Sequence, residues 1–558
     1  MTDTANGGLP EAAAKPVSGG KDQDFDDMLL GGADPAHIVD IIENDDMPAH
    51  ERILAIIESE DDAPPHERIA GWIDGADPAP EGEQGGARTP VDAPNASPRS
   101  WGFDVEEINR SYALAIWGGK ALVVNEQPHG PLNDRVRLMS FESMNSWFAN
   151  RQTEVVGSDG KIKSVTWAKA WHQHPNRRQY DGVEFFPNPD GAASTPNYLN
   201  LWRGFSITPS PKGHCGRFLD HLRANVCRDN DEYYRYLFGW MAHLVQRPRE
   251  RPGIALVMRG RKGTGKTVVG EVLGSLFAPH YFPVDDARYL TGQFNAHMSS
   301  CLLLQADEAM WAGDKAAEGR LKGLLTSRIQ MIEQKGVDPI RMENRVRVIM
   351  TSNEDWVIPA TGDERRFFVL DVGSYAEQNN EYFAEMYEEL DAGGREKLLH
   401  ELLSFDLDNF NIWRIPQTKA LLDQKLRSLD PIDDFVFNRL WAGSWLHGDD
   451  AWRGTVVRDD LYAEYLKDAS RMGIGRKRSS ADFGKRLKKL IPGIGDIRPS
   501  VEREPGVVKR TWCYSMPSLD ECRNAFDKCV GQPIDWPVLP PGESERAQRT
   551  SPDDDTPV

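Results

Sequence analysis

A glycine-rich segment with one lysine has the residue types and spacing needed to hold a phosphate chain. It reads Gly260, Arg261, Lys262, Gly263, Thr264, Gly265, Lys266 and Thr267, which fits the pattern G-x-x-x-x-G-K-[ST]. Backbone N–H groups of such a loop surround an anion, and the following helix points its positive end at that anion. Lys266 is therefore predicted to reach the β- and γ-phosphates of ATP, and the Thr267 hydroxyl is predicted to bind Mg²⁺.

The residues around this loop have the periodicities that the motif requires. An apolar run at 254–258 precedes it, and apolar residues recur at helical spacing from Val268 to Phe277. Further apolar runs lie at 281–284, 301–304, 346–350 and 367–370. Apolar runs that do not alternate with polar residues are typical of parallel strands buried on both faces. We therefore expect an α/β fold with a parallel sheet, in which the loop joins a strand to a helix.

Paired carboxylates and an amide follow two of these predicted strands. Asp307 and Glu308 come 41 residues after Lys266, and Asn353 ends the run that begins at 346. Asp307 is predicted to bind Mg²⁺ through water, and Glu308 to polarise the water that attacks the phosphate. The amide of Asn353 is predicted to contact the γ-phosphate and to position that water.

Two arginines enter the last predicted strand of the sheet. Arg365 and Arg366 directly precede the apolar run at 367–370. This position fits an arginine finger, which neutralises charge in the transition state of phosphoryl transfer. The alternative is a surface ion pair with Asp363 or Glu364.

The order and compact spacing of Lys266, Asp307, Glu308, Asn353 and Arg366 resemble the superfamily 3 helicases of viruses and phages, a branch of the AAA+ ATPases. The residues before the loop, 197–205 and 236–248, look like the matching region of phage and poxvirus-type primase-helicases. The resemblance covers about residues 101–530. It implies a homo-oligomeric ring, a hexamer in this family, that hydrolyses ATP with Mg²⁺ at subunit interfaces and moves on single-stranded DNA.

The same resemblance assigns roles outside the nucleotide site. Residues 332–339 look like the family motif that forms a DNA-facing hairpin in the central pore, and Lys335 is the position carried over as a DNA contact. Relatives often have a polymerase-type primase domain upstream. Residues 1–100 are too acidic and too poor in apolar residues for that fold, so a separate primase or polymerase is the expected partner.

A basic helix marks the predicted C-terminal DNA-binding region. Residues 479–490 place Phe483, Leu487 and Leu490 at core spacing. Lys485, Arg486, Lys488 and Lys489 lie elsewhere on the same helix. A helix at 456–469 precedes it and a hairpin at 497–514 follows, which suggests a winged-helix-like domain whose basic helix enters a DNA groove. A solvated charged helix is the alternative.

The net charge of −20 is concentrated at the ends of the chain. Residues 1–100 contain 22 acidic and 6 basic side chains, and residues 541–558 contain 5 and 2. The remainder is nearly neutral, so the overall acidity does not exclude nucleic-acid binding. The acidic N-terminus is predicted to be mostly disordered, with three short helical repeats that begin at His37, His50 and His66.

Other sequence features indicate the cellular compartment. The chain has no apolar run of membrane-spanning length, no secretory signal, and six cysteines without a C-x-x-C pair. These features favour a protein with reduced thiols in the cytoplasm of a bacterial host, without membrane contact.

The segments predicted from composition and periodicity are a mostly disordered tail, a mixed α/β domain, an ATPase core, a helical extension, a winged-helix-like domain and a second tail: 1–100, 101–250, 251–372, 373–428, 429–530 and 531–558. The function predicted first is a phage or prophage replicative DNA helicase driven by ATP. Two alternatives are a nucleotide-switched initiator or loader that binds an origin with little unwinding, and an AAA+ regulator of protein complexes.

Overall fold

The computed structural model describes residues 102–127, 130, 135–156, 160–292, 295–308, 315–334, 337–362, 364–449, 451–475 and 477–538. The helical repeats predicted before residue 101 lie outside this range, as do Lys335, Asp363 and most of the predicted tail after 531. Within the described range, no helix is both long enough and apolar enough to cross a membrane.

The first described part, residues 102–205, consists of short helices and small sheets. Its elements are α4 (Val105–Asn109), β1 (Tyr112–Trp117), β2 (Lys120–Glu126), β3 (Val136–Met139), α5 (Phe141–Trp147), β4 (Gln152–Val156), β5 (Ile162–Thr166), α6 (Trp167–Gln173), β6 (Gln179–Tyr180), β7 (Gly182–Glu184) and β8 (Tyr198–Asn200). The sequence predicts a hairpin from the apolar runs 112–117 and 120–124, which Gly118 and Gly119 separate. This hairpin is present as β1 and β2, in a sheet of order β3-β2-β1-β6. The sequence predicts a helix over 140–149 with Ser140 as its N-cap. Ser140 indeed accepts a hydrogen bond from the Ser143 N–H and so caps α5.

The central part of the chain folds around a five-stranded sheet. Its strands are β9 (Ala255–Arg259), β10 (Tyr281–Val284), β11 (Leu303–Asp307), β14 (Arg347–Ser352) and β15 (Phe367–Asp371). They are all parallel, in the order β10-β11-β14-β9-β15. Each of the five apolar runs of the sequence therefore forms one strand, and most of their side chains are buried.

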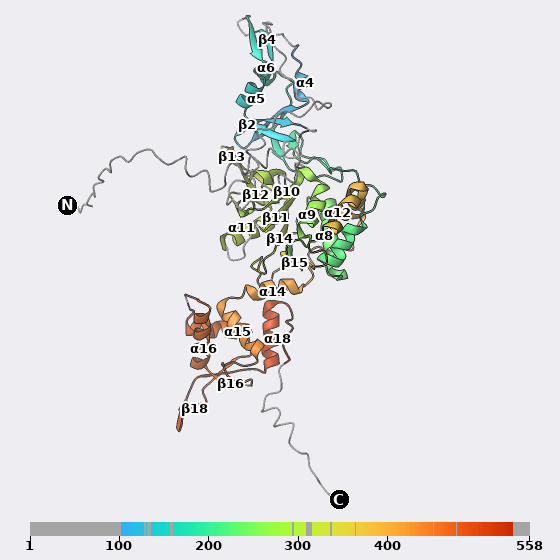
Figure 1. Cartoon of the computed structure of the whole chain (residues 1–558). Coiled ribbons are helices and arrows are strands. Elements are labelled where there is room, and N and C mark those ends of the chain that lie inside the picture. The colour runs from blue at the N-terminus through green and yellow to red at the C-terminus, as the bar shows by residue number, and fades with distance from the viewer. Residues whose placement is uncertain are drawn as a thin grey trace, which may run out of the picture. The chain divides into compact units, whose positions relative to one another are not determined.

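Helices and one hairpin complete this central part. They are α7 (Gly216–Asp220), the π-helix η2 (His221–Val226), α8 (Asp231–Gln246), α9 (Lys266–Ser275), η3 (Ala278–His280), α10 (Ala287–Thr291), η4 (Ala296–Ser300), α11 (Lys315–Thr326), β12 (Ile329–Gln334), β13 (Val337–Glu343), α12 (Asn380–Glu389), the π-helical turn η5 (Leu390–Gly394), α13 (Arg395–Ser404) and α14 (Lys419–Arg427). Helix α9 lies against the sheet (Figure 1). One hydrophobic cluster extends from Ala113 to Leu421, across the predicted boundaries at 250 and 372.

Helix α9 packs unusually close to the sheet because two of its residues are glycines. A Cβ at Gly270 would lie 1.8 Å from Gln305 Oε1, and one at Gly274 would lie 2.2 Å from the Tyr281 ring. Because the helix lies so close, Gln305 Nε2 donates a hydrogen bond of 3.2 Å to the Thr267 carbonyl. The first turn of α9 is thus held at a fixed height above β11.

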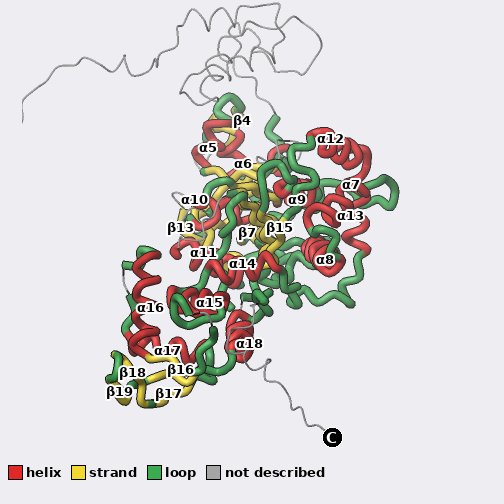
Figure 2. The backbone as a smooth tube through the Cα atoms, turned by 60° about the horizontal axis from the view of Figure 1, so that its bottom comes forward, coloured by secondary structure: helices red, strands yellow, loops and turns green. Residues whose placement is uncertain are grey.

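The C-terminal part has its own core, which extends from Ile432 to Ile534. Its elements are α15 (Pro431–Ala442), β16 (Thr455–Val457), α16 (Arg458–Arg471), α17 (Ser480–Leu490), β17 (Gly495–Ile497), β18 (Ser500–Glu504), β19 (Val507–Arg510), β20 (Cys513–Ser515) and α18 (Leu519–Val530). Figure 2 shows the hairpin β18–β19 beside β17. The prediction that a helix begins at Val456 was wrong, because Val456 pairs with Tyr514 in the sheet and α16 begins two residues later.

The four basic residues proposed for DNA contact on α17 fall into two groups. Lys485 and Lys489 are exposed. Lys488 instead forms an ion pair with Asp496, and Arg486 binds the carboxylate of Asp433 on α15 with two nitrogens. The predicted DNA contact at Arg486 did not anticipate this ion pair within the C-terminal part. The physical reason is that Asp433 is 9% exposed at its side chain and needs a cation to balance its charge.

Removal of the Arg486 side chain should therefore destabilise the C-terminal part. We expect Arg486→Ala to lower its unfolding free energy by about 1–3 kcal/mol, because a buried carboxylate loses two charged hydrogen bonds. Lys485→Ala is the matched control on the same helix and should change little. Urea unfolding followed by tryptophan fluorescence measures both, and equal stability of the two variants would contradict the structural role of Arg486.

Candidate functional site

The carboxyl-terminal edge of the central sheet collects the polar residues that the sequence singled out. The glycine-rich loop leaves β9 at this edge, Asp307 is the last residue of β11, and Asn353 follows β14. The strand register aligns Asp307 with Thr351 and Ser352 with Arg259. Residues of the loop together with Asp307, Glu308 and Asn353 line one cavity of about 280 Å³.

The loop turns into helix α9 through Gly265, which has a φ of +83° and so adopts a backbone conformation that favours glycine. The side chain of Lys266 then folds back along the loop. Its Nζ donates hydrogen bonds to the carbonyls of Gly260 (2.8 Å) and Arg261 (2.6 Å) and to Asn353 Oδ1 (3.0 Å). Lys266 is 6% exposed. A lysine in a loop is expected to be solvated. That expectation is wrong for Lys266, because the loop backbone supplies acceptors in place of water.

Burial lowers the pKa of Lys266, while the charges of Asp307 and Glu308 act in the opposite direction. The ammonium group therefore faces two carboxylates across the cavity. A phosphate chain placed there would meet a cation that is already held in position.

Asp307 is held by two hydroxyl groups. Thr267 Oγ1 donates to Asp307 Oδ2 at 3.0 Å, and Thr351 Oγ1 donates to Asp307 Oδ1. A hydroxyl and a carboxylate side by side are the oxygen donors that Mg²⁺ prefers, with water and phosphate oxygens completing its shell. In the described part of the chain no three His, Cys, Asp or Glu side chains form a metal-binding group.

Glu308 has an unusual backbone conformation for a residue with a side chain. Its φ is +51°, and its N–H donates to the Thr351 carbonyl at 2.9 Å. A non-glycine residue in this region costs about 1 kcal/mol, and such residues occur preferentially at functional sites. The Glu308 carboxylate accepts a hydrogen bond from Asn353 Nδ2. Asn353 thus links the carboxylate of Glu308 to the ammonium of Lys266.

Three residues that the sequence analysis did not single out surround the same loop. His221 Nε2 lies 3.2 Å from the Gly265 carbonyl, and Asn225 Nδ2 donates to the Thr264 carbonyl at 2.7 Å. Phe383 of α12 lines the cavity. Burial lowers the pKa of His221 to about 4, so its ring is neutral at pH 7. These residues lie about 40 positions before the loop or more than 100 after it, and no local motif marks them.

The two arginines proposed as a finger are placed differently. Arg366 Nη1 contacts both carboxylate oxygens of Glu364 at 3.1 and 3.2 Å, and the Glu364 side chain is fully buried. This is the ion pair that was the alternative, and its cause is the buried charge of Glu364. Arg365 is exposed. Neither arginine lines the cavity of its own chain.

Comparison with known proteins gives a family and a relative. Residues 258–366 match a family of unknown function, DUF5906. Over 198 residues, 35% of this chain and 27% of the relative, the chain is 24% identical to the DNA primase-polymerase of Nitratiruptor phage NrS-1. The chain therefore spans only about a quarter of the length of that relative.

Solved structures extend this similarity to the fold. Two apo structures of the C-terminal region of NrS-1 match with TM-scores of 0.51 and 0.53, at 15% and 14% identity. Each match covers 74% of this chain and 98% of the other. The chain is thus related in sequence to a phage DNA primase-polymerase and shares the fold of its C-terminal region.

Proposed function

We propose that the chain is the ATP-driven motor of a phage-type DNA replication protein, a AAA+ helicase of superfamily 3 that moves on single-stranded DNA. The observation that carries this proposal is the convergence of Lys266, Thr267, Asp307, Glu308 and Asn353 on one cavity at the carboxyl-terminal edge of a parallel sheet. Ligands of open α/β sheets bind at this edge. The relation to a phage primase-polymerase supports a role in DNA replication.

The geometry supports the following role for each residue of the site. The loop N–H groups and Lys266 bind the phosphates of ATP, and Thr267 and Asp307 hold Mg²⁺. When bound there, Mg²⁺ would supply positive charge opposite the phosphate oxygens. Glu308 accepts a proton from the attacking water, and Asn353 orients that water because it already joins Glu308 to Lys266.

An arginine finger would come from a second copy of the chain. Arg365 is exposed and lies outside the cavity of its own chain, whereas Arg366 is bound to Glu364. We therefore assign the finger to Arg365 of a neighbouring subunit in a ring. The C-terminal part, with Lys485 and Lys489 exposed on α17, is a candidate for duplex DNA contact in the manner of a winged helix.

An origin-binding initiator or loader remains the second candidate, supported by the same exposed lysines. Strand displacement on a forked duplex separates the two. Unwinding that requires ATP supports the helicase, and ATP-dependent duplex binding without displacement supports the initiator.

Replacement of the loop lysine tests the nucleotide site. We expect Lys266→Ala to lower ATP turnover at least a hundredfold, because the phosphates lose their buried cation. Lys212→Ala, which removes an exposed lysine outside the cavity, should keep wild-type turnover. Phosphate release measures both variants, and thermal unfolding checks that both are folded. Turnover near wild type in Lys266→Ala would refute the proposed function.

Replacement of the second carboxylate separates binding from hydrolysis. Glu308→Gln should bind ATP with wild-type affinity, because an amide oxygen can still accept from Asn353. Its turnover should fall at least a hundredfold, because an amide cannot take the proton of the attacking water. Binding of a fluorescent ATP analogue and single-turnover hydrolysis measure the two steps. A loss of ATP affinity would show that Glu308 is structural.

The two arginines should give opposite results. We expect Arg365→Ala to block hydrolysis, to keep ATP binding and to leave the melting temperature unchanged. Arg366→Ala should instead lower the melting temperature, because it leaves the buried Glu364 carboxylate without its cation. Differential scanning calorimetry and ATP turnover decide between them. Normal hydrolysis in Arg365→Ala would remove this residue from the mechanism.

A further inference from the structure

Four arginines line one hollow at the amino-terminal edge of the central sheet, opposite to the glycine-rich loop. We call it the arginine pocket. Its volume is about 560 Å³, and its lining residues are Phe186, Arg249, Arg251, Arg328, Glu343, Asn344 and Arg345. Arg328 directly precedes β12, and Arg345 lies between β13 and β14. The pocket therefore lies at the base of the hairpin β12–β13.

Two of the arginines are fixed at the back of the pocket. Arg249 binds the Asp190 carboxylate with both terminal nitrogens, at 2.8 and 2.6 Å, and its guanidinium lies 4.8 Å from the centre of the Phe186 ring. Arg251 donates to the carbonyls of Leu324 (3.2 Å) and Leu325 (2.7 Å) at the end of α11. Arg251 has no carboxylate among its described hydrogen-bond partners.

The other two arginines share one carboxylate. Arg345 binds Glu343 with one terminal nitrogen and donates the other to the Arg249 carbonyl. Its Nε is buried and has no hydrogen-bond partner among the described residues. Arg328 lies 3.4 Å from the same Glu343, and its side chain is 86% exposed. Glu343 thus faces two cations, and the Arg328 side chain, although paired with Glu343, is largely exposed to solvent, where a ligand can reach it.

The pocket carries an excess of positive charge. Four guanidinium groups face the carboxylates of Asp190 and Glu343, which leaves two charges in excess. Arg347, fully buried beside Arg251, adds one more cation, and Glu250 adds one more carboxylate. Burial lowers the pKa of Arg251, and the charge of Arg345 lowers it further to a smaller extent. Clustered guanidinium groups of this kind match phosphate oxygens, which they bind bidentately.

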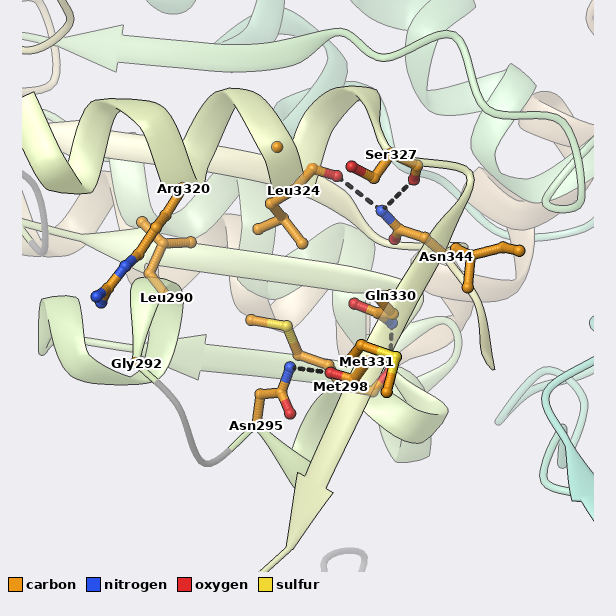
Figure 3. Close-up of a pocket in the computed structure, with 12 residues that line it drawn as sticks. Leu290, Gly292, Asn295, Met298, Arg320, Leu324, Ser327, Gln330, Met331 and Asn344 are labelled. Carbon is orange, nitrogen blue, oxygen red and sulfur yellow. Dashed lines mark hydrogen bonds between the residues drawn. The ribbon is translucent and has the colours of Figure 1, made fainter. Parts of the chain in front are cut away.

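A second hollow, lined by both polar and apolar residues, adjoins the arginine pocket. It has a volume of about 530 Å³ and shares Asn344, whose Nδ2 donates to the carbonyls of Leu324 and Ser327 (Figure 3). Ile329 and Met331 of β12 line this hollow and are 52% and 50% exposed. Large apolar side chains beside a cationic pocket suit a ligand that alternates charged and flat apolar groups, as single-stranded DNA does.

We propose that the arginine pocket binds the phosphodiester backbone of single-stranded DNA, with Arg328 as the residue that meets the incoming strand. The proposal rests on the proposed function, because it gives the motor a DNA contact remote from the nucleotide. The exposed Ile329 and Met331 then contact the bases of the strand whose phosphates the arginines bind. DNA binding at this pocket requires neither bound ATP nor the residues that join β12 to β13.

Equilibrium binding without nucleotide tests the proposal. A fluorescein-labelled oligothymidylate is titrated with the full chain over a range of salt concentrations, and anisotropy reports the affinity. We expect Arg328→Glu to weaken binding at least tenfold. Arg328→Ala should weaken it several-fold and reduce the slope of log K against log[salt] by about 0.7, the value for one lost phosphate contact on a single strand. Thermal unfolding should be unchanged in both variants, because Arg328 is largely exposed.

Arg288→Glu is the matched control, because Arg288 is 85% exposed and also pairs with one carboxylate, that of Asp286. It should weaken binding less than twofold. Equal affinities of Arg328→Glu and Arg288→Glu would overturn the proposal. It would also fail if Arg328→Glu bound DNA normally and lost only the binding of inorganic tripolyphosphate, since the pocket would then hold a free polyphosphate. Neither readout depends on ATP turnover, so failure of the proposed function is detected separately by Lys266→Ala.

Discussion

The register of three neighbouring parallel strands is the constraint on which the candidate site depends. Strands β11, β14 and β9 run in the same direction, so their carboxyl ends meet at one edge. Pairing of Asp307 with Thr351 allows the threonine hydroxyl to hold the carboxylate, and the same alignment places Asn353 beside the loop. A strand that slipped by one residue would turn these side chains into the opposite layer.

The candidate site also requires that helix α9 packs close to the sheet. Gly270 and Gly274 permit a distance at which Gln305 reaches the Thr267 carbonyl and Thr267 reaches Asp307. A side chain at Gly270 would displace Gln305, because Gln305 Oε1 lies only 1.8 Å from the position of a Cβ. Chemistry at Thr267 therefore depends on two residues that have no side chain. A glycine that is needed for close packing cannot be recognised from its residue type in the sequence.

Local patterns in the sequence were sufficient to predict the parallel sheet, the β1–β2 hairpin and the Ser140 cap of α5. They also selected Lys266, Asp307, Glu308 and Asn353, which the structure brings to one cavity. Local patterns could not predict contacts between segments that are distant in the sequence. His221 and Asn225 reach the loop from a π-helix, and the pairing of Arg486 with Asp433 joins two helices 53 residues apart. The arginine pocket assembles from four segments, none of which forms a motif.

The two charged sites lie at opposite edges of one sheet, and the proposals place nucleotide at one edge and DNA at the other. The most direct test of the nucleotide site is a structure determined with Mg²⁺ and a non-hydrolysable ATP analogue. The account predicts the γ-phosphate within hydrogen-bond distance of Lys266 Nζ, with the metal between Thr267 and Asp307. A cavity that stays empty at saturating analogue, or an analogue bound elsewhere, would contradict it.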